Sequence, residues 1–199
     1  IARAVFGLGE TVVAADSAGS SVTNLVYIVL SSFYSASISF AGQNYGARNF
    51  KRIDKCLWNG VLIVEVMFFC ANLVMTLFPE VFLRLFTDNM EVIQTGIPKM
   101  YITSWGYMIY TISEIANGCQ RGFGKSIGPT ILNIITICGI RIAWVLFVFP
   151  YLEPNLVSLY IVFPISWTCS AAAQVISYYK ARNKKMRLAA EEGTLSQKF

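Results

Sequence analysis

Five long runs of apolar residues, interrupted only by isolated polar positions, follow one another along the chain. A helix needs about 20 predominantly apolar residues to cross the hydrocarbon core of a bilayer, so each run predicts a transmembrane helix. The predicted spans are residues 11–41, 54–79, 97–119, 126–151 and 155–179. Residues 1–9 are interpreted as the end of a further helix. The pattern predicts an all-α, polytopic transmembrane helix bundle of about five complete helices plus the end of a sixth.

Prolines and a short apolar stripe mark where these helices stop. Pro79, Pro150 and Pro154 stand at expected helix ends, because proline lacks a backbone donor and clashes with the preceding turn. Between the second and third spans, an apolar stripe predicts a short helix in the membrane interface, formed by Val81, Phe82, Leu85 and Phe86.

Two further features predict how the third span begins. Asp88, followed three residues later by Glu91, resembles a capping box. Pro98 comes soon after Gly96 and predicts a break or kink before the membrane-spanning part.

Basic residues gather at alternate ends of the predicted helices. Lys and Arg accumulate on the cytoplasmic side of membranes, and here twelve lie on one side while only Arg84 and Lys99 lie on the other. This asymmetry predicts an integral membrane protein, interpreted as one of a bacterial cytoplasmic membrane, and not a nucleic-acid footprint. The segments predicted to be cytoplasmic are 42–53, 120–126 and 180–199, and those predicted to face outward are 80–96 and 151–155. The transmembrane lobe is assigned to residues 1–182 and a cytoplasmic tail to 183–199.

Composition excludes several classes of function. The chain is 55% hydrophobic and only 14% charged, too few charged residues to cover a water-soluble globule. It contains no histidine, so histidine-dependent nucleophiles, general bases and zinc sites are excluded. We therefore expect no enzyme, no cofactor and no metal site. The cysteines show no C-x-x-C spacing and predict neither a metal site nor a redox pair: Cys56, Cys70, Cys119, Cys138 and Cys169.

The segment GFGKS at residues 122–126 resembles part of a phosphate-binding loop. The complete motif requires glycine at position 119, where this chain has Cys119, and it follows a strand. We interpret the segment as a turn between two transmembrane helices, in which Gly122 and Gly124 permit unusual backbone angles.

The first span carries small polar residues along one helical face. Their spacing is mostly three, four or seven residues, so this face is expected to point into protein or water. Two interpretations stay open: close helix packing through small residues, or one wall of a hydrated cavity. The residues of this face are Ser17, Ser21, Asn24, Ser31, Ser35 and Ser39.

The third span contains Glu114, the leading candidate for a functional residue, because a carboxylate within a bilayer is costly. Thr103, Tyr107 and Thr111 share its stripe and predict a continuous cavity wall. The rings of Tyr107 and Tyr110 are candidates to contact a cationic substrate. The alternative for Glu114 is a position near the cytoplasmic interface, where it is solvated or paired with Arg121.

Four other ionisable residues fall within or near the spans, and we interpret them as two structural pairs. At about 1.5 Å rise per residue, Arg3 and Asp16 have similar depths, as do Glu65 and Arg141. Burying any of these charges alone is costly, so the prediction is that Arg3 pairs with Asp16 and Arg141 with Glu65.

Several segments together resemble the multidrug and toxic compound extrusion (MATE) family of secondary transporters. The stretch SFAGQNYGARNFKRIDK at 39–55 is similar to the signature after that family's eighth helix, and LRLFTDNMEVI at 83–93 to the segment before the tenth. GCQRGFGKSIGP at 118–129 resembles the turn between helices ten and eleven, and GIRIAW at 139–144 fits helix eleven. The signature residues are Gly42, Gln43, Asn44, Gly46, Gly118, Arg121 and Gly122.

The resemblance implies one lobe of a two-lobe, twelve-helix transporter: the end of helix seven, followed by helices eight to twelve. It implies an antiporter that exports organic cations by alternating access, driven by sodium ions or protons, with the N-terminal lobe as the missing partner. Some members place an acid in helix ten at the position that Tyr110 occupies here, one turn before Glu114. The candidate substrate or ion cavity comprises Glu114, Tyr107, Tyr110, Thr111, Thr103, Asn24 and Ser31.

Two other functions stay open at this point. One is a flippase of related fold that exports a lipid-linked precursor, which a strongly basic central cavity favours. The other is a membrane subunit that does not transport.

Overall fold

The computed structural model describes residues 5, 7, 9–153 and 155–196. Across these residues the secondary structure is helical, and no strand is formed. Three long helices come first, with a short one between the second and third: α2 (Glu10–Gly46), α3 (Phe50–Leu77), α4 (Pro79–Arg84) and α5 (Met90–Gly122). The next segment is helical with π turns: α6 (Ile127–Asn133), η1 (Ile134–Gly139), α7 (Ile140–Ala143), η2 (Trp144–Val148) and η3 (Phe149–Tyr151). The last two helices are α8 (Leu156–Tyr160) and α9 (Val162–Ser196).

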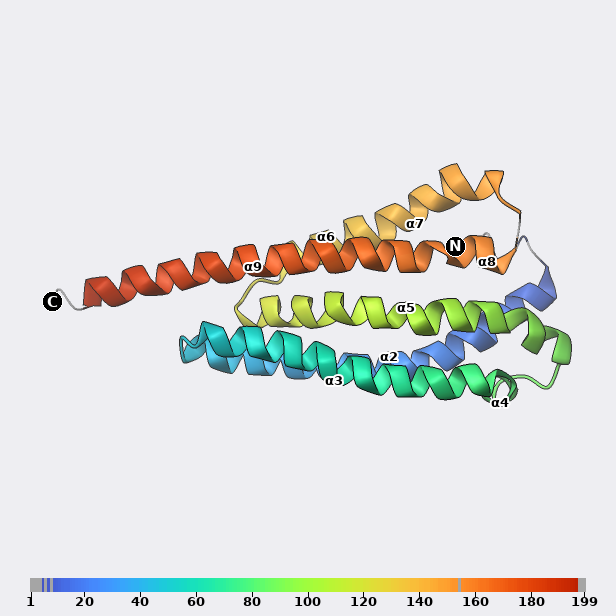
Figure 1. The fold of residues 1–199 in the computed structure, drawn as a ribbon. Helices are drawn as coiled ribbons and strands as arrows, with labels where there is room; N and C mark the ends of the chain where they lie inside the picture. The colour runs from blue at the N-terminus through green and yellow to red at the C-terminus, as the bar shows by residue number, and fades with distance from the viewer. Residues whose placement is uncertain (1–4, 6, 8, 154, 197–199) are drawn as a thin grey trace.

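The helices run side by side and reverse direction at each connection (Figure 1). The α2–α3 and α5–α6 turns lie at one end of the bundle, together with the C-terminal half of α9. The α4 region and the connection into α8 lie at the other end. The segments that carry the basic excess therefore share one end, as the alternation of charge predicted.

Four helical segments within the described ranges are long and apolar enough to cross a membrane: Glu10–Gly46, Phe50–Leu77, Ile127–Tyr151 and Leu156–Glu191. They correspond to four of the five predicted spans. α2 and α9 extend beyond those spans, and α9 continues through the predicted tail as far as Ser196. The predicted span 97–119 lies within α5, which is long enough but is not among the sufficiently apolar segments.

The polar character of α5 follows from its position. It packs against α2, α3 and α9 and lies in the middle of the bundle (Figure 1). Many of its polar side chains are buried within the bundle: Lys99, Thr103, Ser104, Thr111, Ser113, Glu114, Asn117 and Gln120. A helix enclosed by other helices does not need an apolar surface on every side.

The start of α5 differs from the prediction in its cap. Its N-cap is Asn89, whose side chain accepts a hydrogen bond from the Glu91 backbone N–H at 2.9 Å, so the capping box expected at Asp88 is wrong. The α-helix runs through Pro98 without a break. The short helix predicted near Val81 is present as α4. Pro154 lies outside the described residues.

The signature glycines let α5 and α2 approach each other closely. A Cβ atom on Gly118 would lie 2.0 Å from Ser37 Oγ and 2.9 Å from the Tyr34 carbonyl oxygen of α2. A Cβ atom on Gly122 would lie 2.6 Å from Ala41 Cβ and 2.7 Å from the Ile38 carbonyl oxygen. Real Cβ contacts are not this short, so side chains are excluded at both positions. Small residues thus set the distance between the two helices.

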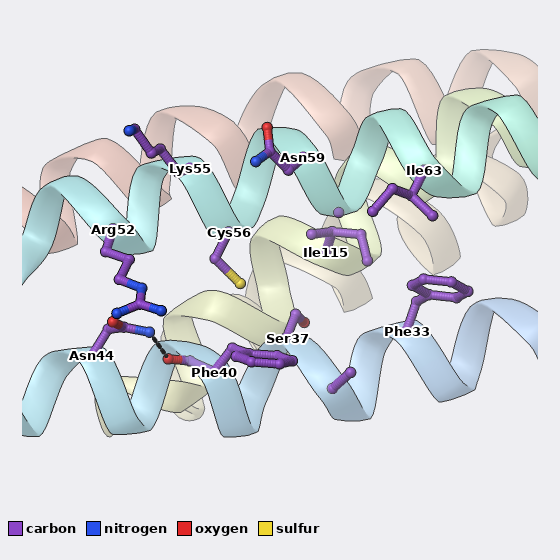
Figure 2. A pocket seen from close by; sticks show the side chains of 12 residues that line it. Phe33, Ser37, Phe40, Asn44, Arg52, Lys55, Cys56, Asn59, Ile63 and Ile115 are labelled. Atoms are coloured by element: carbon purple, nitrogen blue, oxygen red, sulfur yellow. Dashed lines mark hydrogen bonds between the residues drawn. The ribbon is translucent and has the colours of Figure 1, made fainter.

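A groove opens between the halves of α2 and α3 next to their shared turn (Figure 2). The turn is closed by backbone hydrogen bonds, including Asn49 N–H to the Asn44 carbonyl at 2.8 Å. Asn49 then caps α3 by accepting from the Arg52 backbone N–H at 3.1 Å. The family-like signature at residues 42–46 therefore forms the end of α2 and the beginning of this turn.

Candidate functional site

A cavity of about 270 Å³ lies where α2, α5, α7 and α9 meet. Five of its lining residues are aromatic and one is charged. The residues come from five elements: Asn24 and Tyr27 from α2, Tyr107 and Tyr110 from α5, Ile137 from η1, Arg141 from α7, and Phe163 and Trp167 from α9. The cavity surface therefore combines aromatic rings with polar groups, both of which can contact a small molecule.

The aromatic wall depends on one small residue of α5. Trp167 stacks on Tyr107 with ring centroids 5.1 Å apart and lies 5.5 Å from the ring of Tyr110. A Cβ atom on Gly106 would lie only 2.4 Å from the Trp167 ring, so glycine is required for the ring to rest on the helix. Gly106 therefore allows the Trp167 ring to lie directly against α5.

Arg141 occupies the other side of the cavity. Its guanidinium carbon lies 3.8 Å from the centroid of the Phe163 ring, and its Nε donates to Ser166 Oγ at 3.1 Å. The predicted ion pair between Arg141 and Glu65 is wrong, because no such pair forms between these two described residues. The ring face and the hydroxyl of α9 stabilise the cation in place of a carboxylate.

Glu114 lies one helical turn beyond the cavity wall and is 6% exposed. The Tyr110 hydroxyl donates to its Oε1 at 2.7 Å. Arg121 donates to Asn117 Oδ1 at 3.3 Å and to Thr130 Oγ1 at 2.9 Å, and it does not pair with Glu114. Glu114 is thus buried in the bundle, and no Glu114–Arg121 ion pair forms among the described residues.

The structure brings together only some of the predicted cavity residues. Asn24, Tyr107 and Tyr110 line the cavity, and Glu114 contacts it through Tyr110. Thr103 and Thr111 are buried and donate to carbonyl groups of their own helix. Ser31 also donates to its own helix, at the Ile28 carbonyl. These three hydroxyls do not line the cavity. Residues that share one face of a helix can be covered by different neighbouring helices, so helical spacing alone does not show which of them reach a cavity.

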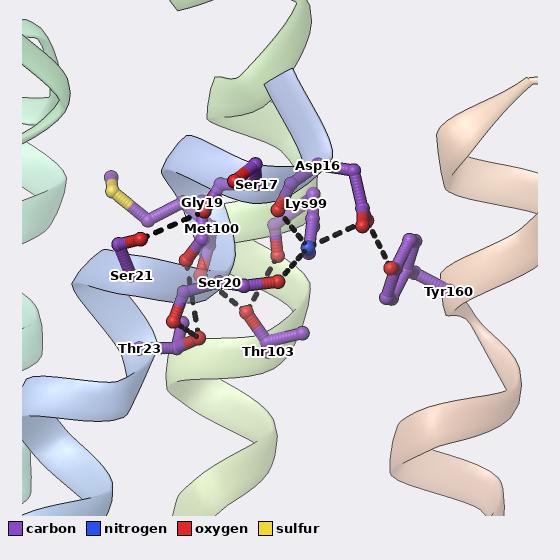
Figure 3. A network of polar contacts seen from close by, with 10 residues as sticks. All are labelled: Asp16, Ser17, Gly19, Ser20, Ser21, Thr23, Lys99, Met100, Thr103 and Tyr160. Carbon is purple, nitrogen blue, oxygen red and sulfur yellow. Dashed lines mark hydrogen bonds and ion pairs between the residues drawn. The ribbon is translucent and has the colours of Figure 1, made fainter. Parts of the chain in front are cut away.

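A second polar cluster lies at the end of the bundle where α2 begins (Figure 3). Lys99 Nζ is 2.6 Å from Asp16 Oδ1 and donates to Ser20 Oγ at 2.6 Å. The Tyr160 hydroxyl donates to the same Asp16 oxygen. The cluster links α2, α5 and α8. Arg3, the predicted partner of Asp16, lies outside the described residues.

The sequence interpretation missed a buried amide network between α5, α6 and α9. Gln120 Nε2 donates to Gln174 Oε1 at 2.9 Å, and Gln174 Nε2 donates to the Asn133 Oδ1 at 2.8 Å. Ser177 donates to Gln120 Oε1 at 2.7 Å. Gln174 lies within a predicted span, and its polar amide in an apolar segment is the signal that could have identified the network.

Residues 2–146 match the model of the MatE family. The chain is 22% identical, over 149 residues, to a Bacillus subtilis (strain 168) protein named "Probable multidrug resistance protein YoeA", covering 75% of this chain and 32% of that protein.

Solved structures show the same fold. The Vibrio cholerae MATE transporter VcmN in the bent form matches with a TM-score of 0.82 and 17% identity, over 92% of this chain and 41% of that one. A MATE structure in the straight conformation matches with a TM-score of 0.80 and 17% identity, over 95% of this chain and 42% of that one. The chain spans less than half the length of these relatives. Because the family model covers more than half of the sequence, the chain belongs to the MatE family.

Proposed function

We propose that the protein is a secondary active antiporter that exports organic cations or drugs in exchange for sodium ions or protons by alternating access. In this proposal, ions and substrate stabilise different conformations of one cavity, and no covalent chemistry is needed. Family membership and the multidrug resistance name of the Bacillus subtilis relative support it.

The observation that carries the proposal is a buried carboxylate beside an aromatic cavity. Aromatic faces attract an organic cation, and the Glu114 carboxylate supplies the negative charge. The Tyr110 hydroxyl connects the two, because it lines the cavity and donates to Glu114. A cation or proton bound at Glu114 would therefore change the hydrogen bonding of a residue in the cavity wall.

The proposal includes a second lobe and an orientation. The relatives' greater length fits an N-terminal lobe that would complete the cavity. The basic excess at the α2–α3 turn, the α5–α6 turn and the end of α9 supports a cytoplasmic position for that end of the bundle, within a bacterial cytoplasmic membrane.

Replacement of Glu114 by Gln tests the proposal. Gln keeps the size of the side chain and removes its charge. We therefore expect the export of an aromatic cationic dye by the complete protein to fall about tenfold, which corresponds to a loss of about 1.4 kcal/mol in the free energy of cation binding. The measurement is dye efflux from cells, or counterflow in proteoliposomes, at equal protein levels.

Glu65→Gln is the matched control. Glu65 is also a carboxylate within a long helix, is half-buried, and is not in the cavity, so this variant should export at the parental rate. Parental export by Glu114→Gln would contradict the assignment of Glu114. Absence of dye export by the parental protein, with transfer of a lipid-linked precursor instead, would favour the flippase alternative, for which Arg141 is the basic cavity residue.

A further inference from the structure

The groove between α2 and α3 is separate from the proposed transport cavity. It has a volume of about 400 Å³ and shares no lining residue with that cavity. Figure 2 shows Phe33 and Phe40 of α2 on one side, Ile63 of α3 on the other and Ile115 of α5 behind them. Phe40 is 56% exposed and Ile63 is 51% exposed, so an apolar surface is left uncovered.

Two cations border the apolar groove at the end nearest the turn. Arg52 and Lys55 both line it and both have exposed side chains. Figure 2 shows the Arg52 guanidinium between the helices near Asn44 of α2, and the Lys55 side chain extending from α3 away from α2. Neither side chain forms an ion pair within the described residues. The neighbouring carboxylate, Asp54, is already bound: Arg182 lies 2.6 Å from its Oδ2, and the Tyr178 hydroxyl donates to its Oδ1 at 2.7 Å. The groove thus carries positive charge that the described chain does not neutralise.

The arrangement of charge and apolar surface matches the shape of one membrane component. From Lys55 to Ile63 the groove follows α3 for about 12 Å, at about 1.5 Å rise per residue, away from the bundle end and into the apolar part of the helix. A molecule with an anionic head and an apolar chain would place the head at the two cations and the chain along the phenylalanines. Basic pockets between transmembrane helices bind anionic lipid headgroups in this way.

We propose that the groove between α2 and α3 is a binding site for an anionic phospholipid from the leaflet at the basic end of the bundle. Arg52 binds the phosphate of the headgroup, Lys55 adds exposed positive charge beside it, and Phe33, Phe40 and Ile63 contact one acyl chain. The site is independent of the exported substrate, so it stands whether or not the proposed transport activity is correct.

Lipid retention by the complete purified protein tests the site. Native mass spectrometry would compare binding of phosphatidylglycerol with phosphatidylcholine in the parental protein and in the Arg52→Gln/Lys55→Gln variant. We expect a preference for phosphatidylglycerol in the parental protein and a loss of about tenfold or more in apparent affinity in the variant. The matched control is Lys51→Gln/Lys180→Gln, which removes two exposed charges that do not line the groove and should change the affinity less than about twofold.

Cys56 gives a second, local measurement because its thiol lies in the groove (Figure 2). Its rate of alkylation by an uncharged maleimide, read by peptide mass spectrometry, should fall several-fold in phosphatidylglycerol nanodiscs relative to phosphatidylcholine nanodiscs. Cys70, which is exposed on the same helix but outside the groove, is the internal control and should react equally in both.

A third variant tests the acyl-chain half of the site. Gly60 lines the groove, and a Cβ atom there meets only Ile115 Cγ2, at 3.5 Å. Gly60→Leu should fill the groove and abolish the lipid preference, whereas Gly60→Ala should keep it. Equal retention of both lipids by the parental protein would overturn the proposal. So would equal alkylation rates of Cys56 in phosphatidylglycerol and phosphatidylcholine nanodiscs.

Discussion

Lys99 lies in a different environment from the one that its position in the sequence predicts. Its position near the end of a predicted span made it one of two basic residues assigned to the outer side, yet it is 2% exposed. Its ammonium is held by Asp16 and Ser20 of α2. Because the side chain points into the bundle, Lys99 is an interhelical contact rather than a marker of membrane orientation.

Removing either partner of the Lys99–Asp16 ion pair should destabilise the protein. Lys99→Met leaves the Asp16 carboxylate without its cation, and because that carboxylate is 23% exposed we expect a loss of no more than about 3 kcal/mol. The double variant Lys99→Met/Asp16→Asn should recover part of this loss. Thermal unfolding of the complete protein in detergent, followed by tryptophan fluorescence, measures both effects; equal unfolding temperatures for the single variant and the parent would show that the pair contributes little.

The candidate site was only partly predictable at this scale. Asn24, Tyr107 and Tyr110 were identified because polar and aromatic residues stand out in apolar helices. Arg141 was noticed but assigned the wrong partner, because equal depth says nothing about which helices are neighbours. Trp167 gave no signal in the sequence, since an aromatic residue in a membrane span is more often a packing or interface residue.

At the scale of helices, the role of each small residue of α2 depends on which neighbouring helix lies against it. The face of the first span admitted two interpretations, packing or cavity wall. Asn24 of that face lines the cavity, whereas the close contact with Gly118 is made by Ser37, which is not one of the residues of the predicted face. The spacing of residues in the sequence shows which of them share a helix face. It does not show which neighbouring helix covers each turn of that face.

Gly118 and Gly60 offer a direct comparison of two glycines in long helices. Gly118→Ala forces a methyl group against Ser37 and the Tyr34 carbonyl of α2, and should cost about 1 to 3 kcal/mol. Gly60→Ala meets only an ordinary contact with Ile115, so helix propensity should leave it neutral or stabilising by up to about 1 kcal/mol.

Unfolding temperatures of the two variants, measured side by side, should therefore change in opposite directions or by clearly different amounts. An unfolding temperature of Gly118→Ala at or above that of Gly60→Ala would contradict this prediction. It would show that α2 and α5 can move apart at little cost, so that their close contact at Gly118 is not required for stability.

At the scale of the whole molecule, the order and direction of the helices could be predicted well. Apolar runs and alternating basic segments gave the five long helical segments and placed their connections at the correct ends. The packing of these segments could not be predicted, because lipid-facing and protein-facing apolar residues look alike in a sequence. The extra lengths of α2 and α9 were missed for a related reason: a helix can continue past the membrane without an apolar signal.

The orientation of the bundle can be tested with two exposed positions at opposite ends. In a cysteine-free version of the complete protein, Lys184→Cys should be protected from a membrane-impermeant maleimide in intact cells, and Glu153→Cys should be labelled. Permeabilised cells provide the control, because both positions should then react. Labelling of Lys184→Cys alone in intact cells would reverse the proposed orientation.

The enclosed position of α5 also bears on how the protein enters its membrane during synthesis. A helix with Lys99, Glu114 and Gln120 along its length partitions poorly into lipid when it is alone, since each charged residue near a helix centre costs about 2.5 to 3.5 kcal/mol on insertion scales. Its neighbours α2 and α3 precede it in the chain and bury part of its polar surface. Membrane integration of α5 is therefore expected to depend on helices that were made before it, and to be completed by α9, which follows it in the chain.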